Sequence, residues 1–227
     1  MKFIFLLFYN FVEDNFHLKK IKNYLQKKIF LSKPIIFDVG SHKGKITKLF
    51  RDIYSEGTIH CFDPNSAFRK DLKKLGKNVK IHNFALGDKV EKRKILFNDL
   101  DLTTSLSEIN KHSIYIKVKN LIINKPQEKN LHEINVNTLE NFCDENNIKE
   151  IDLLKIDVEG YELMVLLGAK SIIKNVKFIM IEIQKNDMYQ NYSKDKIDDF
   201  LKKNGFKLIK SFNFPFMFFQ DNLYKKS

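Results

Sequence analysis

Acidic side chains stand at or beside the ends of several buried-looking runs in this sequence. Asp38 lies in "PIIFDV", Asp63 ends "GTIHCFD", Asp157 and Glu159 follow "IDLLKI", and Glu182 lies in "VKFIMIEI". One such residue is typical of a helix cap. In a parallel sheet, however, ligands bind beyond the carboxyl ends of the strands, so five carboxylates at one edge indicate a binding site.

Asp63 follows Asp38 at a spacing that suits a nucleoside ligand. A carboxylate at the end of the second strand can accept hydrogen bonds from both hydroxyls of an adenosine ribose, in NAD or in S-adenosylmethionine. Asp38 favours S-adenosylmethionine, because a carboxylate beside the following helix N-terminus would repel a pyrophosphate. Gly40 and Gly44, in "FDVGSHKG", would let the backbone approach the ligand and the helix pack close to the strand.

The stretch "LLKIDVEGYE" holds the second group of polar residues. Glu162 suits the N-terminal end of the helix that follows. Asp157 and Glu159 would instead lie where an acceptor meets the methyl group of the cofactor, with Glu182 on the next strand. The histidines carry no site prediction, because His60 and His82 alternate in strands as structural residues do.

Alternating strands and helices would position these residues. From Pro34 onward, short apolar runs alternate with amphipathic stretches, which predicts an α/β fold with a parallel sheet and helices on both faces. The predicted strands are "PIIFDV", "GTIHCFD", "VKIHNFAL", "HEINVN", "IDLLKID" and "VKFIMIEI". The alternation breaks over about residues 88–130, where "KRKILF" and "SIYIKV" predict small strands in an excursion over the sheet edge. We therefore expect a helical cap segment at 1–33 and one domain at 34–227.

The bulk composition sets broad limits on function. With 227 residues and two cysteines, the chain predicts one core and no disulfide framework, and we expect a cytoplasmic protein. The net charge of +12 comes from lysines spread over almost every segment, which favours solvated helix faces over a nucleic-acid site. The start, "MKFIFLLFYNFV", is too short to span a bilayer and predicts a cap helix. Because basic residues follow it, peripheral contact with a membrane surface is the alternative.

The motifs in this order resemble the FkbM family of S-adenosylmethionine-dependent methyltransferases. The resemblance runs from "FDVGSHKGKIT" through "CFDPN", "NFALGD", "INVNTLENF", "LLKIDVEGYELMVLLGA" and "IMIEI" to "DNLY". In the family's usual D-V-G-A-N-x-G turn, Ser41 and His42 replace alanine and asparagine. The resemblance implies a class I methyltransferase fold, with a mostly parallel Rossmann-like sheet and an antiparallel C-terminal strand. It also implies that Asn83, Ala85 and Leu86 surround the adenine or ribose, that Ser41 lies in the cofactor turn, and that the acceptor is a glycan or small-molecule hydroxyl.

A neutral hydroxyl is a poor nucleophile and needs a base or a metal ion. Asp157 is the first candidate for the base or the acceptor-orienting group, and Glu159 is the second. Lys155 could stabilise their charge or a developing alkoxide. As an alternative, Asp157 and Glu182 could hold a Mg²⁺ ion, since hard cations prefer carboxylate oxygens.

Three rival functions remain open from the sequence. An RNA-directed methyltransferase would suit the positive charge, but the acidic strand ends argue against a nucleic-acid partner. A non-catalytic cofactor-binding module in glycan assembly is disfavoured by the intact "KIDVEGYE". A NAD-dependent oxidoreductase is disfavoured by Asp38.

Overall fold

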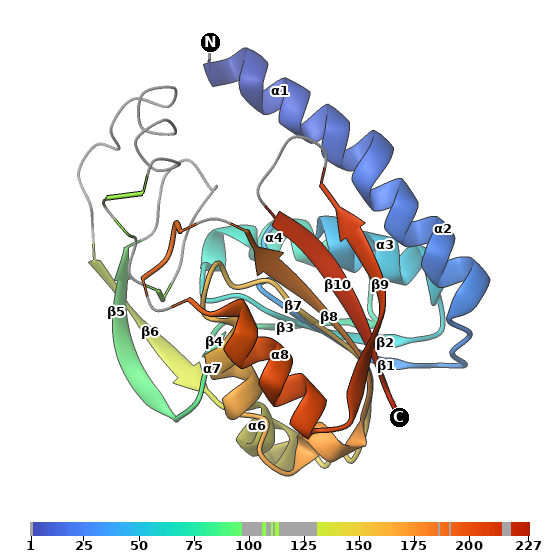
Figure 1. The fold of residues 1–227 in the computed structure, drawn as a ribbon, viewed down its shortest axis with the longest axis vertical. Helices are drawn as coiled ribbons and strands as arrows, with labels where there is room; N and C mark the ends of the chain where they lie inside the picture. The colour runs from blue at the N-terminus through green and yellow to red at the C-terminus, as the bar shows by residue number, and fades with distance from the viewer. Residues whose placement is uncertain are drawn as a thin grey trace.

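A seven-stranded sheet in the order β3-β2-β1-β7-β8-β10-β9 forms the centre of the molecule (Figure 1). This computed structural model describes residues 2–96, 106–107, 110, 112–113, 131–185, 187–190, 192–214 and 219–227. The strands of the large sheet are β1 (Ile35–Val39), β2 (Thr58–Phe62), β3 (Val79–His82), β7 (Ile151–Ile156), β8 (Val176–Gln184), β9 (Phe206–Asn213) and β10 (Phe219–Lys226). β3, β2, β1, β7 and β8 pair in parallel, while β10 pairs antiparallel with both β8 and β9. The predicted α/β fold with an antiparallel C-terminal strand is confirmed.

Helices cover both faces of this sheet (Figure 1). They are α2 (Leu18–Lys28), α3 (Lys45–Ile53) and α4 (Arg69–Lys73) on one face, and α6 (Leu139–Glu145), α7 (Glu162–Leu167), η3 (Ile172–Asn175) and α8 (Lys194–Lys203) on the other. The short helix η2 (Ser66–Phe68) directly precedes α4. Because successive side chains in a strand point to opposite faces, the central strands serve both layers. Ile36 packs in the core with α2, α3 and α4, whereas Phe37 packs with α6.

A second, three-stranded sheet in the order β4-β6-β5 corrects two strand predictions. Its strands are β4 (Ala85–Leu86), β5 (Glu91–Leu96) and β6 (Leu131–Asn137). The run predicted as one strand over 79–86 divides into β3 and β4, and the run predicted at 132–137 joins the small sheet instead of the large one. β5 confirms the small strand expected at "KRKILF", while the other one, at 113–118, lies outside the described residues beyond Ser113.

The N-terminal segment forms a nearly continuous helical rod along one flank (Figure 1). It consists of α1 (Lys2–Val12), the π-helix η1 (Glu13–His17) and α2. α2 buries Ile21 and Leu25 in the core beside the sheet. The Lys45 Nζ ties the rod to the start of α3 by contacting the Glu13 carboxylate at 2.6 Å and the Asn10 side-chain oxygen at 2.8 Å. Among the residues described, no helix is long and apolar enough to cross a membrane.

Candidate functional site

A cavity of about 400 Å³ opens at the carboxyl ends of β1, β2, β7 and β8. This is the edge where an open α/β sheet binds ligands, and the volume is in the range of small-molecule sites. The lining includes Asp38, Gly40, Ser41, Asp63, Ala85, Leu86, Lys155, Asp157, Glu159 and Glu182. Tyr9, Asn10, Glu13, His17 and Leu18 line it from the N-terminal rod, and Ile95 lines it from β5. The cavity therefore lies between the strand ends of the large sheet, the N-terminal rod and β5. The rod precedes the alternating strands and helices of the main domain, and β5 interrupts them.

The glycine turn after β1 is fixed by contact with the turn after β7. Gly40 has a φ of +80°, and a Cβ built on it would lie 1.8 Å from the Asp157 carbonyl oxygen. Its N–H donates to the Phe62 carbonyl at 2.9 Å, so the turn also joins β2. The sequence predicted that Gly40 lets the backbone approach a ligand. In the structure, its missing side chain makes room for the backbone that carries Asp157.

Gly44, in the same turn, lies against α4. It has a φ of +81°, and a Cβ there would lie 2.8 Å from the Leu72 side chain of α4. The missing side chain of Gly44 thus lets α4 lie against the turn from which α3 begins. Both glycines occupy the left-handed region, which other residues rarely adopt.

Asp38 is buried beside this turn and bonded from within the protein. Its carboxylate accepts a hydrogen bond from the Thr47 hydroxyl of α3 at 2.5 Å. Burial raises the pKa of Asp38 to about 6, opposed by the Thr47 bond and by Lys155. Asp38 therefore anchors α3 to β1 and adds negative character to the wall of the cavity.

Asp63 connects the glycine turn to the loop after β2. Its two carboxylate oxygens accept the backbone N–H groups of His42, at 2.9 Å, and Asn65, at 2.8 Å. His42 has a φ of +48°, and its ring packs against Phe68 with the centroids 4.2 Å apart. Asp63 also lines the cavity, and a carboxylate oxygen can accept more than one hydrogen bond.

The residues expected around an adenine or ribose are only partly assembled. Ala85 and Leu86 are buried and line the cavity, and the buried Ser41 lies there too. Asn83 does not line the cavity. It is exposed, and its side-chain amide donates to the Pro64 carbonyl at 3.4 Å. Asn83 lies in the break between β3 and β4, whereas Ala85 and Leu86 form β4.

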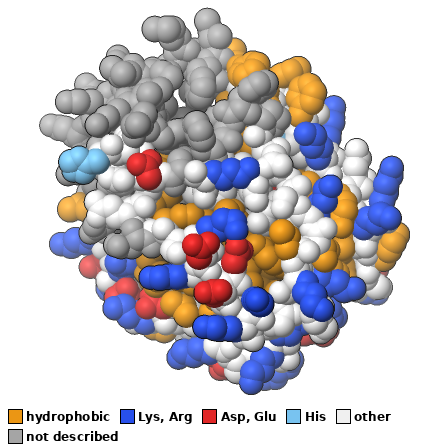
Figure 2. Space-filling model, in the orientation of Figure 1, with side chains coloured by type: hydrophobic (Ala, Val, Ile, Leu, Met, Phe, Trp, Pro, Cys, Tyr) orange, Lys and Arg blue, Asp and Glu red, His pale blue; other side chains and the backbone are white. Residues whose placement is uncertain are grey.

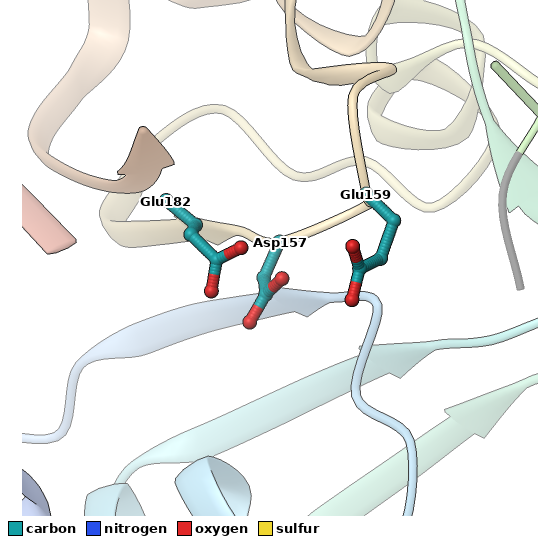
Figure 3. Close-up of side chains that lie close together, drawn as sticks. All are labelled: Asp157, Glu159 and Glu182. Atoms are coloured by element: carbon teal, nitrogen blue, oxygen red, sulfur yellow. The ribbon is translucent and has the colours of Figure 1, made fainter. Parts of the chain in front are cut away.

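Three carboxylates meet on the other side of the cavity (Figure 3). Asp157 and Glu159 come from the turn after β7, and Glu182 comes from β8. One oxygen from each lies within 4.8 Å of the others. Burial raises the pKa of Glu182 well above its ordinary value, and Asp157 and Glu159 raise it further. Such an arrangement could ligate a cation, but acidic groups of this kind are common without one.

A buried lysine supplies the positive charge for this cluster. Lys155 is 1% exposed on the central strand β7, and its Nζ lies 3.2 Å from Asp157 and 3.0 Å from Asp221 on β10. Burial alone would lower the pKa of Lys155, but the neighbouring carboxylates outweigh it and raise that pKa. Lys155 therefore stays an ammonium and cannot serve as a base.

Asp221 extends this buried chain to the N-terminal rod. Its second carboxylate oxygen lies 2.7 Å from the His17 Nε2. Burial would raise the pKa of Asp221, but Lys155 and His17 lower it to about 2. Neither His17 nor Asp221 was predicted as a site residue. Asp221 lies in the "DNLY" that ends the family resemblance, opposite Glu182 in the β8–β10 pairing, whereas His17 carries no sequence signal.

The turn that carries Asp157 and Glu159 is held by hydrogen bonds that involve Tyr189 and Glu162. Glu159 has a φ of +55°, and its carboxylate accepts the Tyr189 hydroxyl. The Glu162 carboxylate accepts the N–H groups of Val158 and Gly160, at 3.2 and 3.0 Å. Burial raises the pKa of Glu162 to about 7. Glu162 lies at the start of α7 as predicted, and its side chain fixes the preceding turn.

Comparison with known proteins gives the family. The family described as "Methyltransferase FkbM domain" matches residues 38–208, which is most of the chain and includes every strand end in the cavity. The chain belongs to the FkbM methyltransferase family. This confirms the resemblance found in the sequence.

One curated FkbM-type relative adds a more specific comparison. The chain is 23% identical over 160 residues to "2-O-methyltransferase NoeI" of Sinorhizobium fredii, covering 69% of this chain and 66% of that protein. The match thus spans slightly less than two thirds of the relative.

Solved structures confirm the class I methyltransferase fold of this FkbM chain. A methyltransferase FkbM from Methylobacillus flagellatus superposes with a TM-score of 0.57 and 13% identity, covering 88% of this chain and 45% of that one. A magnesium protoporphyrin IX methyltransferase from Synechocystis, solved with bound SAM, gives 0.53 at 10% identity, over 96% and 85% of the two chains. An rRNA methylase from Streptococcus thermophilus gives 0.52 at 11%, over 92% and 96%. At these identities the likeness concerns the fold alone.

Proposed function

We propose that this FkbM-family chain transfers a methyl group from S-adenosylmethionine to a hydroxyl group, on a saccharide or a related metabolite. The observation that carries the proposal is that Asp63 and the Lys155–Asp157 pair line one cavity. The relative's name, a 2-O-methyltransferase, supports oxygen as the acceptor atom. The saccharide acceptor is an expectation from the resemblance and needs its own test.

The residues of the cavity fit this cofactor. The Asp63 carboxylate, which lines the cavity, suits the ribose hydroxyls, and the buried Ala85 and Leu86 offer an apolar wall for the adenine. The carboxylates around the glycine turn and after β7 suit a molecule whose ammonium and sulfonium are positive. The same carboxylates, Asp38 first among them, disfavour a pyrophosphate or a nucleic-acid backbone.

The cofactor would supply an electrophilic methyl group, and the chain must align and deprotonate the acceptor hydroxyl. Asp157 is the best placed of the three carboxylates to take that proton. Burial raises the pKa of Glu182 well above its ordinary value, and its carboxylate already accepts the Gln184 side-chain amide. Glu159 already accepts the Tyr189 hydroxyl. Lys155 fixes the position of Asp157 and balances its charge. Because this ammonium already lies beside Asp157, the Mg²⁺ alternative gains no support.

Isothermal titration calorimetry with S-adenosylmethionine tests the cofactor. We expect binding by the wild type, and Asp63→Ala should weaken it by about 1 to 3 kcal/mol, the cost of leaving hydrogen-bonding groups unpaired. Because Asp63 also holds the His42 and Asn65 backbones, Asp63→Asn is the matched variant that retains one carbonyl oxygen. An absence of binding by folded wild-type protein would refute the cofactor assignment.

Mass-shift screening of oligosaccharides and sugar nucleotides with the cofactor tests the acceptor. With any acceptor so found, Asp157→Asn should lower turnover at least about a hundredfold while leaving cofactor affinity nearly unchanged. Glu159→Gln is the control, because it makes the same chemical change on the same turn and should cost less. Equal turnover in Asp157→Asn and wild type would remove Asp157 as the base. Turnover insensitive to EDTA would separate this mechanism from the Mg²⁺ alternative.

A further inference from the structure

The outer side of α1 exposes large apolar side chains. Leu7, Phe8 and Phe11 are 55%, 54% and 55% exposed, and their spacing places them on one helix face. Phe16, 50% exposed, continues this face, with its ring edge-on to Phe11 at a centroid distance of 6.1 Å. We call these four residues the apolar face. Tyr9, on the opposite side of the same helix, lines the cavity.

The π-helix η1 allows the rod to expose apolar side chains on its outer side and to contact the rest of the protein on its inner side. A π-helix places residues five apart above one another, which brings Phe16 to Phe11 on the outside. The next residue, His17, is thereby buried and reaches Asp221. A regular α-helix would not align Phe16 with Phe11 in this way. The outward position of the four apolar side chains is therefore built into the rod.

A basic groove lies further along the same rod, between α2 and the edge strand β9. It encloses about 540 Å³ and is lined by Lys20, Lys27, Lys28, Lys210, Asn23, Tyr24, Ser211, Phe212 and Asn213. None of these lining residues is acidic. The Lys210 ammonium lies 5.8 Å from the Tyr24 ring centroid. We call this feature the basic groove.

We propose that the apolar face and the basic groove together dock the protein on an anionic lipid bilayer. Apolar side chains on a helix surface insert at the boundary of headgroups and acyl chains, while nearby lysines attract anionic headgroups. In Figure 2, hydrophobic side chains are exposed where α1 runs in Figure 1, and lysines follow along α2 on the same side of the molecule. The excess of lysine in the groove matches the charge of such a surface, and the apolar face is the outside of a helix, which suits a flat bilayer.

Vesicle flotation of the full chain tests this proposal. One vesicle preparation is phosphatidylcholine alone, and the other is an equal mixture of phosphatidylcholine and phosphatidylglycerol. We expect binding to the mixed vesicles at low ionic strength, weakened at high ionic strength because salt screens the lysines. Failure to bind the mixed vesicles at low ionic strength, or equal binding to both preparations, would overturn the proposal.

Paired variants separate a local surface from the general positive charge. Lys27→Glu with Lys28→Glu should weaken binding to the mixed vesicles about tenfold or more. The matched control is Lys202→Glu with Lys203→Glu, which makes the same change in net charge in the last turn of α8. We expect this control to lose much less affinity. Equal losses in the two double variants would mean that only net charge matters, and would overturn the proposed site.

The apolar face has its own pair of variants. Phe8→Ser with Phe11→Ser should weaken vesicle binding about tenfold, since both rings leave the lipid boundary. Val90→Ser with Leu131→Ser, two exposed apolar residues outside the rod, is the control. Unchanged vesicle binding in Phe8→Ser with Phe11→Ser would overturn the role of the apolar face. The role of the apolar face would also be overturned if the wild type formed a dimer and Phe8→Ser with Phe11→Ser dissociated it, because a second copy of the chain would then cover the face.

Discussion

Replacing Gly40 by alanine should damage both the stability of the domain and the cavity. The new Cβ would lie 1.8 Å from the Asp157 carbonyl oxygen, whereas real Cβ atoms stay at least 3.0 Å from such atoms. The turns after β1 and β7 must therefore move apart by roughly 1 Å, an overpacking cost of about 2 to 3 kcal/mol. The φ of +80° adds about 1 to 2 kcal/mol of backbone strain. We expect a total loss of about 4 kcal/mol in the free energy of unfolding.

Alanine substitutions at two other glycines would measure the overpacking cost and the backbone-strain cost separately. Gly76 has a φ of +107° with nothing within 4 Å of its built Cβ, so Gly76→Ala should cost only the backbone strain, about 1 to 2 kcal/mol. Gly168 has an ordinary φ of −73°, but its Cβ would lie 1.9 Å from the Gly87 carbonyl oxygen. Gly168→Ala should therefore show the steric cost without the strain, and at a place that does not line the cavity.

Urea unfolding followed by circular dichroism gives the three losses, and calorimetry gives the affinity for S-adenosylmethionine. Gly40→Ala should lose more stability than either control, and it alone should lose cofactor affinity at a temperature where all three variants are folded. A Gly40→Ala protein no less stable than Gly76→Ala would refute the close approach of the two turns. Undiminished cofactor affinity in Gly40→Ala would refute the view that this approach shapes the cavity.

Three further predictions concern buried ionisable groups. Asp221→Asn leaves the Lys155 ammonium with one carboxylate partner and should lower the free energy of unfolding by about 3 kcal/mol; a loss near zero in urea unfolding would contradict the buried ion pair. Burial raises the pKa of Glu162 from 4.5 to about 7, so its contribution to stability is complete below pH 4.5 and is lost as the pH rises through 7. Glu162→Gln should lack this decline, worth about 3 kcal/mol between unfolding measurements at pH 5 and pH 8; parallel profiles would contradict it. Burial lowers the pKa values of His60 and His82 from 6.5 to about 4, so their contribution is present above pH 6.5 and is lost as the pH falls through 4. His82→Phe should therefore reduce the drop in melting temperature between pH 6.5 and 4, and an unchanged drop would count against the assignment.

The sequence predicted the strands and their acidic ends because those features depend on local patterns. A run such as "IDLLKI" must be buried on both faces, and a carboxylate after it must lie at the carboxyl edge of the sheet. Asp38, Asp63, Asp157 and Glu182 could therefore be placed at one cavity before the structure was known. The sequence could not show to which sheet "HEINVN" belongs, because burial alternates in the same way along a strand of a large sheet and a strand of a small one.

The sequence could not predict contacts between distant segments. His17 and Asp221 are 204 positions apart, and no spacing rule relates a residue in a helix to one in the last strand. The family resemblance places Asn83 with Ala85 and Leu86, because all three belong to the one motif "NFALGD". The break between β3 and β4 turns Asn83 to the surface, and a break of this kind leaves no mark in hydrophobic periodicity.

Lys155 explains why the two ends of the chain take part in the site. A lysine in a fully buried strand is costly unless carboxylates surround it, since burial penalises an unpaired charge by several kcal/mol. One partner, Asp157, comes from the turn that follows the strand, but the other, Asp221, arrives only when β10 adds to β8, and His17 then covers it from the rod. The charged wall of the cavity is therefore complete only when the last strand and the N-terminal helices are both in place. It follows that β10 and the N-terminal rod, which lie outside the turn of Asp157, help to position that residue. The rod, whose outer side we propose to dock on a membrane, is therefore also a structural part of the site.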